Sequence, residues 1–325
     1  MQLPFLTLSS GQILNAYTIK GFKGQHPLGD LSIYQTDDGS ISLHNSIFNE
    51  GFHCSTGALQ EAQDKFLKPS QLDKFKSSTS IGILDVCVGM GYNTACIIEH
   101  LIKESNPFEW WGLELDSRPI ELGINNPYYK KLWSQQVQEI LLSLHNNGLW
   151  ENKKNRGKVI WGDARIMLTL IPIEVHFDLI LLDAFSPSKC PMLWSEEFLI
   201  QLSKRLVPGG KLLTYCTAAA IRGSLKRAGL QVASLKPLNT EKRKWSNGTI
   251  AIATTKISNK ITQELIWAPL NEREEEHLLT KAAVPYRDPT SNGSSQEIIQ
   301  RREKEQKDSN LEPTNDWKRR WRKTQ

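Results

Sequence analysis

The sequence predicts an α/β fold with a mostly parallel, doubly wound sheet, and two observations lead to this prediction. From residue 81 onward, short apolar runs alternate with segments of helical character, as strand–helix–strand units require. The first run, Ile-Gly-Ile-Leu-Asp-Val-Cys-Val-Gly-Met-Gly-Tyr-Asn at residues 81–93, is typical of a buried strand, a tight turn and a helix N-terminus. Ligands with nucleotide parts bind at such turns, because helix N–H groups are free to face them.

The other elements follow from the same alternation. We expect seven strands, at residues 81–86, 109–114, 158–161, 177–183, 211–215, 231–234 and 249–254. Helices are expected at residues 93–103, 119–144 with breaks near 125–127, 164–170, 195–206 and 219–228. The chain therefore divides into an N-terminal extension at 1–75, an α/β domain at 76–256 and a C-terminal extension at 257–325.

The N-terminal extension is predicted to hold a β-hairpin and a helix. Alternating segments at residues 32–36 and 40–44 flank an Asp-Asp-Gly turn signal. A helix with an apolar face should follow, capped by Ser55 or Thr56. His53 and Glu61 lie in this stretch, where a histidine is more often structural and a glutamate more often solvated than functional.

The composition is that of an ordinary soluble protein. Of the 325 residues, 39% are hydrophobic and 23% are charged, no apolar run could span a bilayer and no secretory signal is recognisable, so we expect a cytoplasmic protein. The five cysteines form no Cys-x-x-Cys pair and the seven histidines no closely spaced pair, which predicts no metal site. The net charge of +5 is compatible with a polyanionic partner without requiring one.

The glycine turn favours one kind of cofactor. Gly89 and Gly91 would let the backbone approach a ligand closely. The third glycine of the dinucleotide fingerprint would fall at position 94, which is occupied by Thr94. A nucleoside cofactor without a pyrophosphate is therefore favoured over NAD, and the alternative is a turn that only closes a strand–helix unit.

Four acidic residues stand at the carboxyl ends of predicted strands, where ligands of an open α/β sheet bind. Asp85 precedes the glycines and would organise the loop or meet a cationic ligand. Glu114 closes the second strand, about 20 residues beyond the glycines, where a carboxylate can accept hydrogen bonds from ribose hydroxyls. Asp163 would contact an adenine amino group or cap the next helix, and Asp183 ends the fourth strand.

The C-terminal extension begins with low apolar density. Residues 285–295 are rich in turn formers and predict a linker to a charged segment, which would be a surface-docked helix followed by a tail. Residues 316–325 carry five basic groups with Trp317 and Trp321 between them. This pattern suits phosphate contacts with base stacking, and equally a solvated helix whose tryptophans dock on the domain.

Three stretches resemble the class I S-adenosylmethionine methyltransferases, and among them the MnmC-type tRNA wobble-uridine methyltransferases. Residues 52–62, Phe-His-Cys-Ser-Thr-Gly-Ala-Leu-Gln-Glu-Ala, resemble the family's Tyr-His-Ser-x-x-Gly-Ala-x-x-Glu-Ala signature after its lead-in hairpin. Residues 88–93 are similar to its Gly-Phe-Gly-Thr-Gly-Leu-Asn loop. Residues 182–194, Leu-Asp-Ala-Phe-Ser-Pro-Ser-Lys-Cys-Pro-Met-Leu-Trp, resemble its Asp-Gly-Phe-Ala-Pro-x-Lys-Asn-Pro-x-x-Trp run, the most specific of the three. The similarity covers about residues 30–255.

The resemblance implies transfer of a methyl group from S-adenosylmethionine to the aminomethyl nitrogen on C5 of uridine 34 in tRNA, giving 5-methylaminomethyl-(2-thio)uridine. Bifunctional members also carry an FAD-dependent oxidase domain, for which 325 residues leave no room, so we expect a stand-alone, monomeric methyltransferase acting on the anticodon stem-loop. Phe52, Cys54, Ser186 and Cys190 depart from the family pattern and bear on substrate identity.

The positions at strand ends and the resemblance together predict roles for individual residues. Asp183 would be catalytic and would bind the amine. The cofactor would be bound by Asp85, Gly89, Gly91, Asn93, Glu114, Asp163 and Asp183. The substrate would be bound by His53, Glu61, Phe185, Pro187, Lys189, Trp194, Lys242, Arg243 and Lys244.

Two other functions are compatible with parts of the sequence. A polyamine aminopropyltransferase shares the fold and a hairpin with Asp-Gly, but its usual Gly-Gly-Gly-Asp-Gly loop is not found and the Phe-Ser-Pro-x-Lys run is foreign to it. A non-catalytic RNA-binding protein on the same fold would have no reason to keep four strand-end acids.

Overall fold

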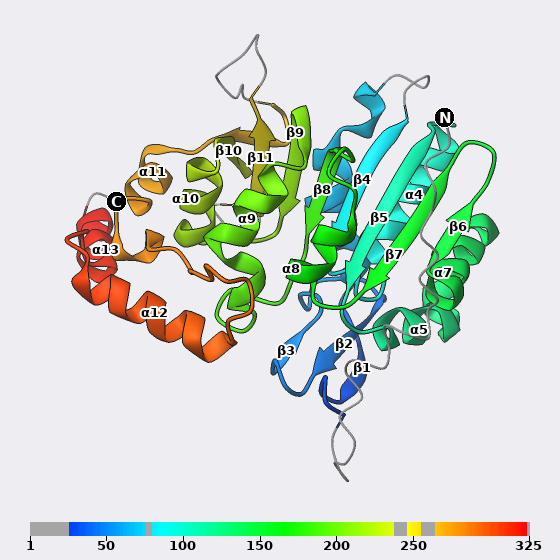
Figure 1. The fold of residues 1–325 in the computed structure, drawn as a ribbon, viewed down its shortest axis with the longest axis horizontal. Helices are drawn as coiled ribbons and strands as arrows, with labels where there is room; N and C mark the ends of the chain where they lie inside the picture. Colours follow the sequence, from blue (N-terminus) through cyan, green and yellow to red (C-terminus); the bar gives the residue numbers. More distant parts are fainter. Residues whose placement is uncertain (1–25, 76–79, 237–245, 255–263, 324–325) are drawn as a thin grey trace.

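The computed structural model describes residues 26–75, 80–236, 246–254 and 264–323, and its centre is a nine-stranded sheet in the order β12-β10-β11-β9-β8-β4-β5-β7-β6 (Figure 1). All seven predicted strands are present: β4 (Ile81–Val86), β5 (Phe108–Glu114), β7 (Arg156–Trp161), β8 (Phe177–Leu182), β9 (Leu206–Thr214), β10 (Leu230–Leu235) and β11 (Gly248–Ala253). Two short edge strands, β6 (Leu149–Glu151) and β12 (Trp267–Pro269), extend the sheet. Three residues are too few for an alternation that a sequence pattern could detect.

Most of the sheet is parallel, which confirms the predicted α/β fold. The strands from β9 through β8, β4 and β5 to β7 run parallel, and β11 lies antiparallel between β9 and β10. β4 lies between β5 and β8, so the strand order reverses on either side of it. The carboxyl end of β4 therefore opens into the crevice where open α/β sheets bind ligands.

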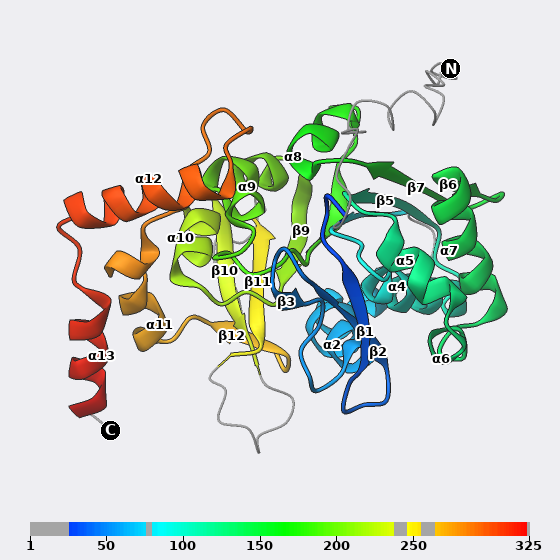
Figure 2. The same ribbon diagram turned by 90° about the horizontal axis from the view of Figure 1, so that it is seen from below.

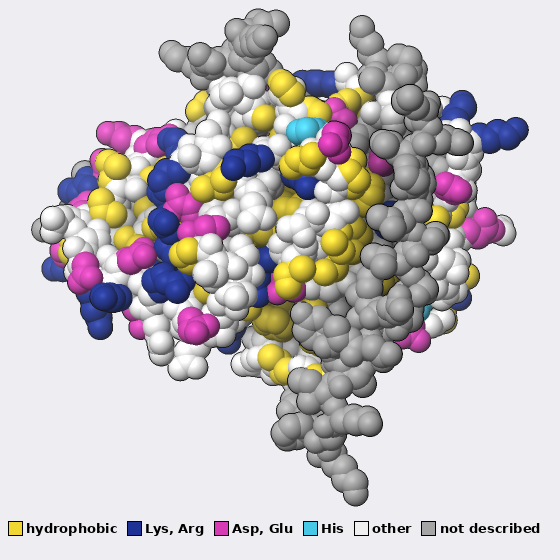
Figure 3. Space-filling model, in the orientation of Figure 1, with side chains coloured by type: hydrophobic (Ala, Val, Ile, Leu, Met, Phe, Trp, Pro, Cys, Tyr) yellow, Lys and Arg dark blue, Asp and Glu magenta, His cyan; other side chains and the backbone are white. Residues whose placement is uncertain are grey.

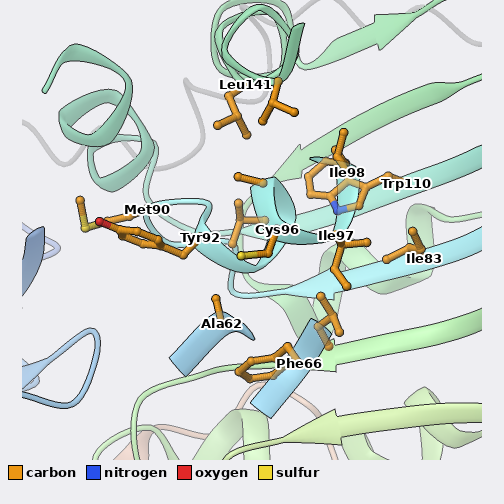
Figure 4. Close-up of a cluster of buried hydrophobic side chains, with 14 of the residues drawn as sticks. Ala62, Phe66, Ile83, Met90, Tyr92, Cys96, Ile97, Ile98, Trp110 and Leu141 are labelled. Carbon is orange, nitrogen blue, oxygen red and sulfur yellow. The ribbon is translucent and has the colours of Figure 1, made fainter. Parts of the chain in front are cut away.

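Helices cover both faces of the sheet. One face carries α4 (Tyr92–Lys103), α5 (Arg118–Asn125), α6 (Pro127–Lys130) and α7 (Gln135–Asn147), and the other carries α8 (Ala164–Met167), α9 (Glu196–Ser203) and α10 (Ala219–Arg227). Neighbouring residues of β4 point to opposite faces: Ile83 joins one buried cluster and Leu84 the other. Figure 4 shows the first cluster, to which β4 contributes Ile83, α4 contributes Ile97 and the N-terminal extension contributes Phe66.

The predicted helices are present, and some of them end earlier than predicted. The predicted helix at 119–144 is broken at the expected place, because the Asn126 side chain caps α6 by accepting a hydrogen bond from the N–H of Tyr128 at 2.9 Å. The helix predicted at 164–170 ends as an α-helix at Met167 and continues as a 3-10 turn. The helix predicted at 195–206 is shorter, since β9 already begins at Leu206.

The N-terminal extension packs at the carboxyl edge of the sheet (Figure 2). Its predicted hairpin is formed by β1 (Leu31–Gln35) and β2 (Ile41–Asn45), and β3 (Glu50–Gly51) adds a third strand. The helix that follows, which we call the lead-in helix, consists of α2 (Ala58–Glu61), the π-helix η2 (Ala62–Leu67) and α3 (Lys68–Ser70), and a 3-10 turn (Leu72–Lys74) comes after it.

The cap predicted at Ser55 or Thr56 is wrong, because the hairpin caps the lead-in helix instead. The N-cap residue is Gly57, which makes no side-chain hydrogen bond. Ser40 Oγ accepts hydrogen bonds from the first two N–H groups of the helix at 3.0 and 3.3 Å, and Asp38 Oδ2 accepts one from the third at 3.0 Å. A Cβ atom at position 57, where φ is 151°, would lie 2.1 Å from Asp38 Oδ2, so this contact requires glycine.

The C-terminal extension is an ordered helical layer at one end of the molecule, at the left of Figure 1. It contains α11 (Glu272–His277), a 3-10 turn (Lys281–Ala283), α12 (Ser295–Asp308) and α13 (Thr314–Lys323). A buried ion pair of 2.7 Å joins Glu274 to Arg222 of α10. Residues 285–295, predicted as a linker, hold two buried side chains, Tyr286 and Asp288, so this segment packs against the domain.

The tryptophans of α13 dock on the protein, which is the second of the two alternatives that the sequence left open. Trp317 is buried and stacks on His277 with ring centroids 4.4 Å apart, and Trp321 Nε1 donates to Glu276 Oε2 at 2.8 Å. Lys318 and Arg322 are exposed. Figure 3 shows basic and acidic side chains intermixed over this end of the molecule.

The described residues contain no disulfide bond. All five cysteines are free thiols. Within the four described ranges, no group of three or more His, Cys, Asp or Glu side chains is placed to hold a metal ion. No helix in the same ranges combines the length and apolar character that crossing a bilayer requires.

Candidate active site

A cavity of about 530 Å³ lies at the carboxyl ends of β4, β5 and β8. The predicted site residues that line it are His53, Glu61, Gly89, Asn93, Glu114, Asp163, Asp183 and Phe185. Five others do not line it: Asp85, Gly91, Pro187, Lys189 and Trp194. Lys242, Arg243 and Lys244 lie outside the described residues. The cavity has two sides, which we call the strand-end wall (Gly89, Glu114, Asp163, Asp183) and the N-terminal wall (Phe48, Glu50, Phe52, Glu61, Lys65).

The glycine turn presents backbone to the cavity, as predicted for Gly89. Gly89 and Gly91 have φ values of 56° and 82°, in the left-handed region that favours glycine. Gly91 is the N-cap of α4 and faces away from the cavity, toward Tyr129. A Cβ atom on Gly89 would approach the Phe52 ring to 3.3 Å, so the turn and the N-terminal wall meet here.

Glu114 closes the strand-end wall beside this turn. Its Oε2 accepts a hydrogen bond from Gly89 N–H at 2.8 Å, and its Oε1 accepts from Leu115 and Asp116 N–H at 2.7 and 2.9 Å. Burial raises the pKa of the Glu114 carboxyl, while these backbone hydrogen bonds oppose the rise. The carboxylate therefore fixes the glycine turn and still borders the cavity.

Asp85 does not reach the cavity, which corrects its assignment as a cofactor contact. The side chain is fully buried beneath the turn, and Thr94 Oγ1 donates to its Oδ2 at 2.6 Å. Burial raises the pKa of Asp85 to about 7. Of the two roles considered for Asp85, the structure supports the organisation of the loop, and Thr94, at the position of the absent third glycine, is its partner.

Asp163 caps the following helix, as one of the two predictions for it stated, and it also faces the cavity. It is the N-cap of α8, where its Oδ1 accepts a hydrogen bond from Arg165 N–H at 3.0 Å, and it also lines the cavity. The Arg165 guanidinium pairs with the same carboxylate at 2.6 Å. The side chain is thus held in one orientation at the end of β7.

Asp183 lies at the junction of the two walls. Asn93 Nδ2 donates to its Oδ2 at 2.8 Å. Burial, and secondarily the nearby Glu61 carboxylate, raise the pKa of Asp183 to about 8, while the Asn93 hydrogen bond and the Lys65 charge act in the opposite direction. At neutral pH this carboxyl group is therefore mostly protonated, and the ionised fraction can accept a proton from a bound group.

Lys65 of η2 is a cavity residue that the sequence did not single out. It forms an ion pair with Glu61, whose other oxygen accepts a hydrogen bond from Cys54 N–H at 2.9 Å. Its ammonium also lies 5.6 Å from the centre of the Tyr215 ring. Desolvation lowers the pKa of Lys65, but the charge of Glu61 and its hydrogen bond outweigh it, and the pKa is raised.

His53 is held as a neutral side chain. Burial lowers its pKa to about 4, against the opposing effect of the Glu61 charge. Its Nδ1 lies 2.9 Å from Ser42 Oγ, and its ring packs edge-on against Tyr92 with centroids 5.1 Å apart. These contacts agree with the structural role that the sequence left open for His53.

Aromatic rings and one carboxylate form the outer part of the cavity. Phe185 stacks on Phe48 with centroids 4.4 Å apart and meets Phe52 edge-on at 5.0 Å. Glu50 accepts hydrogen bonds from Ser186 N–H at 3.2 Å and from Ser186 Oγ at 2.7 Å. Neither Phe48 nor Glu50 was predicted, since nothing in the local sequence marks β3 as part of a site.

Trp194 supports the loop at Phe185 and Ser186 and does not line the cavity, which corrects its assignment as a substrate contact. Its side chain is fully buried, and Nε1 donates to the Phe185 carbonyl at 2.7 Å. Pro187 lies outside the cavity lining, and Lys189 is exposed on the surface beyond it.

Comparisons with known proteins agree with this geometry. Residues 127–251 match the model of a family described as S-adenosyl-L-methionine-dependent methyltransferase. The crystal structure of MnmC2 from Aquifex aeolicus superposes with a TM-score of 0.72 and 27% identity, covering 88% of this chain and 88% of that one. An uncharacterized protein of Methanocaldococcus jannaschii is 26% identical over 287 residues, which cover 88% of this chain and 74% of that protein.

The fold and the cavity are similar to those of S-adenosylmethionine-dependent methyltransferases, whose family model residues 127–251 match. More particularly, the chain resembles MnmC. The tRNA 5-methylaminomethyl-2-thiouridine biosynthesis bifunctional proteins MnmC of Marinomonas and Aromatoleum aromaticum are 23% and 27% identical to it, over 74% and 62% of this chain. The matched regions are 38% and 33% of those proteins, so the chain spans only part of their length.

The residues present fit S-adenosylmethionine. The side-chain-free turn at Gly89 leaves room for a ligand against the backbone, and two carboxylates, Glu114 and Asp163, border the same side of the cavity. Carboxylates at these places can accept hydrogen bonds from ribose hydroxyls and from an adenine amino group.

Proposed function

We propose that the protein methylates the aminomethyl nitrogen on C5 of the wobble uridine, position 34, in tRNA, giving 5-methylaminomethyl-(2-thio)uridine. The observation that carries the proposal is Asp183, a carboxyl group with a raised pKa at the junction of the two walls. The names of the MnmC relatives, which specify 5-methylaminomethyl-2-thiouridine biosynthesis, support the identity of the acceptor.

Transfer to an amine requires the removal of a proton. An alkylamine is mostly protonated at neutral pH, as a lysine side chain is. The Asp183 carboxylate accepts a proton from the substrate ammonium, and the freed lone pair on nitrogen takes up the methyl group as its bond to sulfur breaks. S-adenosylmethionine supplies that methyl group on a sulfonium centre. The pKa of Asp183, about 8, is closer to the pKa of the amine than that of an ordinary aspartate is. The proton transfer is therefore less unfavourable.

The strand-end wall would hold the cofactor in this scheme. Glu114 would accept hydrogen bonds from the ribose, Asp163 from the adenine amino group, and the Gly89 backbone would pack against the nucleoside. Asn93, bonded to Asp183, would keep the carboxylate aimed into the cavity. These roles follow from position at strand ends together with the hydrogen bonds that orient each side chain.

The N-terminal wall would receive the acceptor. The Phe52 ring of this wall, and the Phe185 ring that meets it from the loop after β8, offer apolar faces and edges against which a uracil base can pack. Lys189 is an exposed cation just outside the cavity and suits a phosphate, and Lys242, Arg243, Lys244 and the basic residues of α13 are further candidates for contact with the anticodon stem. A monomer acting in the cytoplasm would suffice for this reaction.

The test is a methyl-transfer assay on tRNA whose wobble uridine carries the free aminomethyl group. After incubation with S-adenosylmethionine, the tRNA is digested and its nucleosides are analysed by mass spectrometry, and we expect the aminomethyl nucleoside to be converted to its methylamino form. A parallel arm supplies putrescine and decarboxylated S-adenosylmethionine. Spermidine formation there without methylation of tRNA would overturn the proposal in favour of aminopropyl transfer, and cofactor binding without either reaction would overturn it in favour of a binding protein.

A further inference from the structure

Arg165 joins the cavity to the C-terminal extension. Its Nε and Nη2 contact the two oxygens of Asp163 at 3.1 and 2.6 Å. Its Nη1 donates to Asp288 Oδ2 at 2.6 Å and to the Gly293 carbonyl at 3.0 Å. The Arg165 side chain is only 9% exposed and that of Asp288 only 1%. One planar guanidinium thus bridges a cavity carboxylate and a buried carboxylate 123 residues away.

The segment around Asp288 is built to hold this carboxylate in place. Asp288 Oδ1 accepts a hydrogen bond from Gly293 N–H at 3.0 Å, and Asp288 N–H donates to Glu197 Oε2 of α9 at 2.8 Å. A Cβ atom at position 293 would lie 2.9 Å from Asp288 Oδ1, so the turn closes around the carboxylate only with glycine there. Both oxygens of Asp288 are therefore used, one within its own turn and one on Arg165.

The orientation of Asp163 depends on this bridge. A guanidinium presents its donors in a fixed plane, so anchoring Nη1 on Asp288 also fixes the directions of Nε and Nη2. Asp163 receives these two groups and the Arg165 backbone N–H. Its remaining acceptor capacity then points in a defined direction at the cavity lining.

We propose that Asp288 is a positioning residue of the cofactor site, which acts through Arg165 to hold the Asp163 carboxylate toward the adenine amino group. The inference deepens the proposed function, because it rests on the adenine-binding role proposed for Asp163. The C-terminal extension would then contribute to cofactor binding as well as packing against the domain.

The test compares the binding of S-adenosylhomocysteine with that of S-inosylhomocysteine, whose base carries a carbonyl oxygen in place of the amino group. The inosyl compound has an acceptor oxygen in place of the amino donor and a hydrogen on N1, so wild-type protein should prefer the adenosyl compound by roughly 10- to 100-fold in calorimetry. Asp163→Asn should reduce this ratio to about threefold or less, and Asp288→Asn should reduce it by about threefold, to a value between those of the wild type and Asp163→Asn. A ratio of affinities is insensitive to a general loss of folded protein.

Glu274→Gln provides the matched control. Glu274 forms the other buried carboxylate–arginine pair between the C-terminal extension and the domain, at 2.7 Å from Arg222, and it does not touch Asp163. Both substitutions should lower the thermal unfolding temperature, but only Asp288→Asn should change the ligand ratio.

Two results would overturn the inference. If Asp163→Asn collapses the ratio while Asp288→Asn leaves it at the wild-type value, Asp288 has no positioning role. If Asp163→Asn leaves the ratio unchanged, Asp163 does not distinguish the two bases and has no contact with the amino group. Neither measurement uses tRNA, so the failure of methyl transfer to tRNA would be recognised separately, in the assay described above.

Discussion

The two walls of the cavity differ in how their side chains are held. Each residue of the strand-end wall stands at the carboxyl end of a strand of one sheet, and hydrogen bonds from the same or a neighbouring strand end hold the carboxylates, as Gly89 holds Glu114 and Asn93 holds Asp183. The N-terminal wall is assembled across the chain, as when Glu50 binds Ser186, 136 residues away. The proposed cofactor side therefore takes its frame from the sheet, with Asp163 held in addition from the C-terminal extension through Arg165, whereas the proposed acceptor side is built from a unit docked on the sheet.

The largest effect is expected at Asp183, where the two walls meet. Asp183→Asn should lower kcat by about 100- to 10,000-fold, because it removes the proton acceptor, and should leave the affinity for S-adenosylmethionine within about threefold. Stopped-time methylation assays and calorimetry measure the two quantities. Asp178→Asn is the control, since Asp178 lies at the opposite end of β8 and bonds Gly82 N–H at 2.8 Å.

The same variant has a signature in stability. A carboxyl group whose pKa is raised by folding favours the folded state most below its unfolded value, near 3.8, and loses this contribution as the pH rises through about 8. Asp183→Asn should therefore gain thermal stability relative to wild type as the pH is raised from 4 to 8. A difference that is constant with pH would show that the group is not protonated in the folded protein.

Glu114→Ala probes the strand-end wall alone. The change removes a ribose acceptor and leaves three backbone N–H groups without their partner, so the affinity for S-adenosylmethionine should fall about 10- to 100-fold. The KM for tRNA should stay near the wild-type value. Glu109→Ala, at the other end of β5, should change neither quantity, and near-wild-type cofactor affinity in Glu114→Ala would remove Glu114 from the site.

The Lys65→Met variant tests how a charge on the N-terminal wall affects the pKa of the proton acceptor, Asp183. The positive charge of Lys65 lowers the pKa of Asp183, so its removal should raise that pKa and move the ascending limb of the pH profile of kcat/KM to higher pH. Lys65→Arg keeps the charge and should keep the limb in place. The pKa of the substrate amine is the same for both variants, so an unshifted limb in Lys65→Met would mean that the limb reports the amine and not Asp183.

Glu50→Gln should have the smallest effect of the four. The substitution weakens the hydrogen bonds that hold the Phe185–Ser186 loop and leaves the strand-end wall unchanged. The KM for tRNA should therefore rise about three- to tenfold, and the cofactor affinity should not change. Ser186→Ala removes only one of the hydrogen bonds and should give a smaller rise. Loss of cofactor affinity in either variant would mean that the two walls are not independent.

The strand-end wall could be predicted from the sequence because its rule is local. A buried run followed by an acid marks Glu114, Asp163 and Asp183 wherever the rest of the chain lies. The rule failed at Asp85, since side chains alternate along a strand and this one points beneath α4 and not into the crevice. It also cannot tell a supporting residue from a contact, and Trp194 proved to be a buried support.

The N-terminal wall was only partly predictable. The hairpin and the lead-in helix were expected from alternation and turn signals, but Phe48, Glu50 and Lys65 enter the cavity because the extension is docked on the sheet. No pattern within a few residues of these positions contains that information. A family motif marked Glu61, and the ion pair with Lys65 then explains why a charged side chain is retained at this buried place.

The cap that the hairpin supplies to the lead-in helix has a consequence for motion. The first three N–H groups of the helix find their acceptors 18 to 22 residues earlier, so hairpin and helix should open and close as one cooperative unit. Amide hydrogens of residues 58–60 would then exchange with solvent at the rate of the hairpin and not at the faster rate of a frayed helix end. Any movement that lifts the hairpin would also carry Glu61 and Lys65 away from Asp183, and with them two opposing charges that act on its pKa.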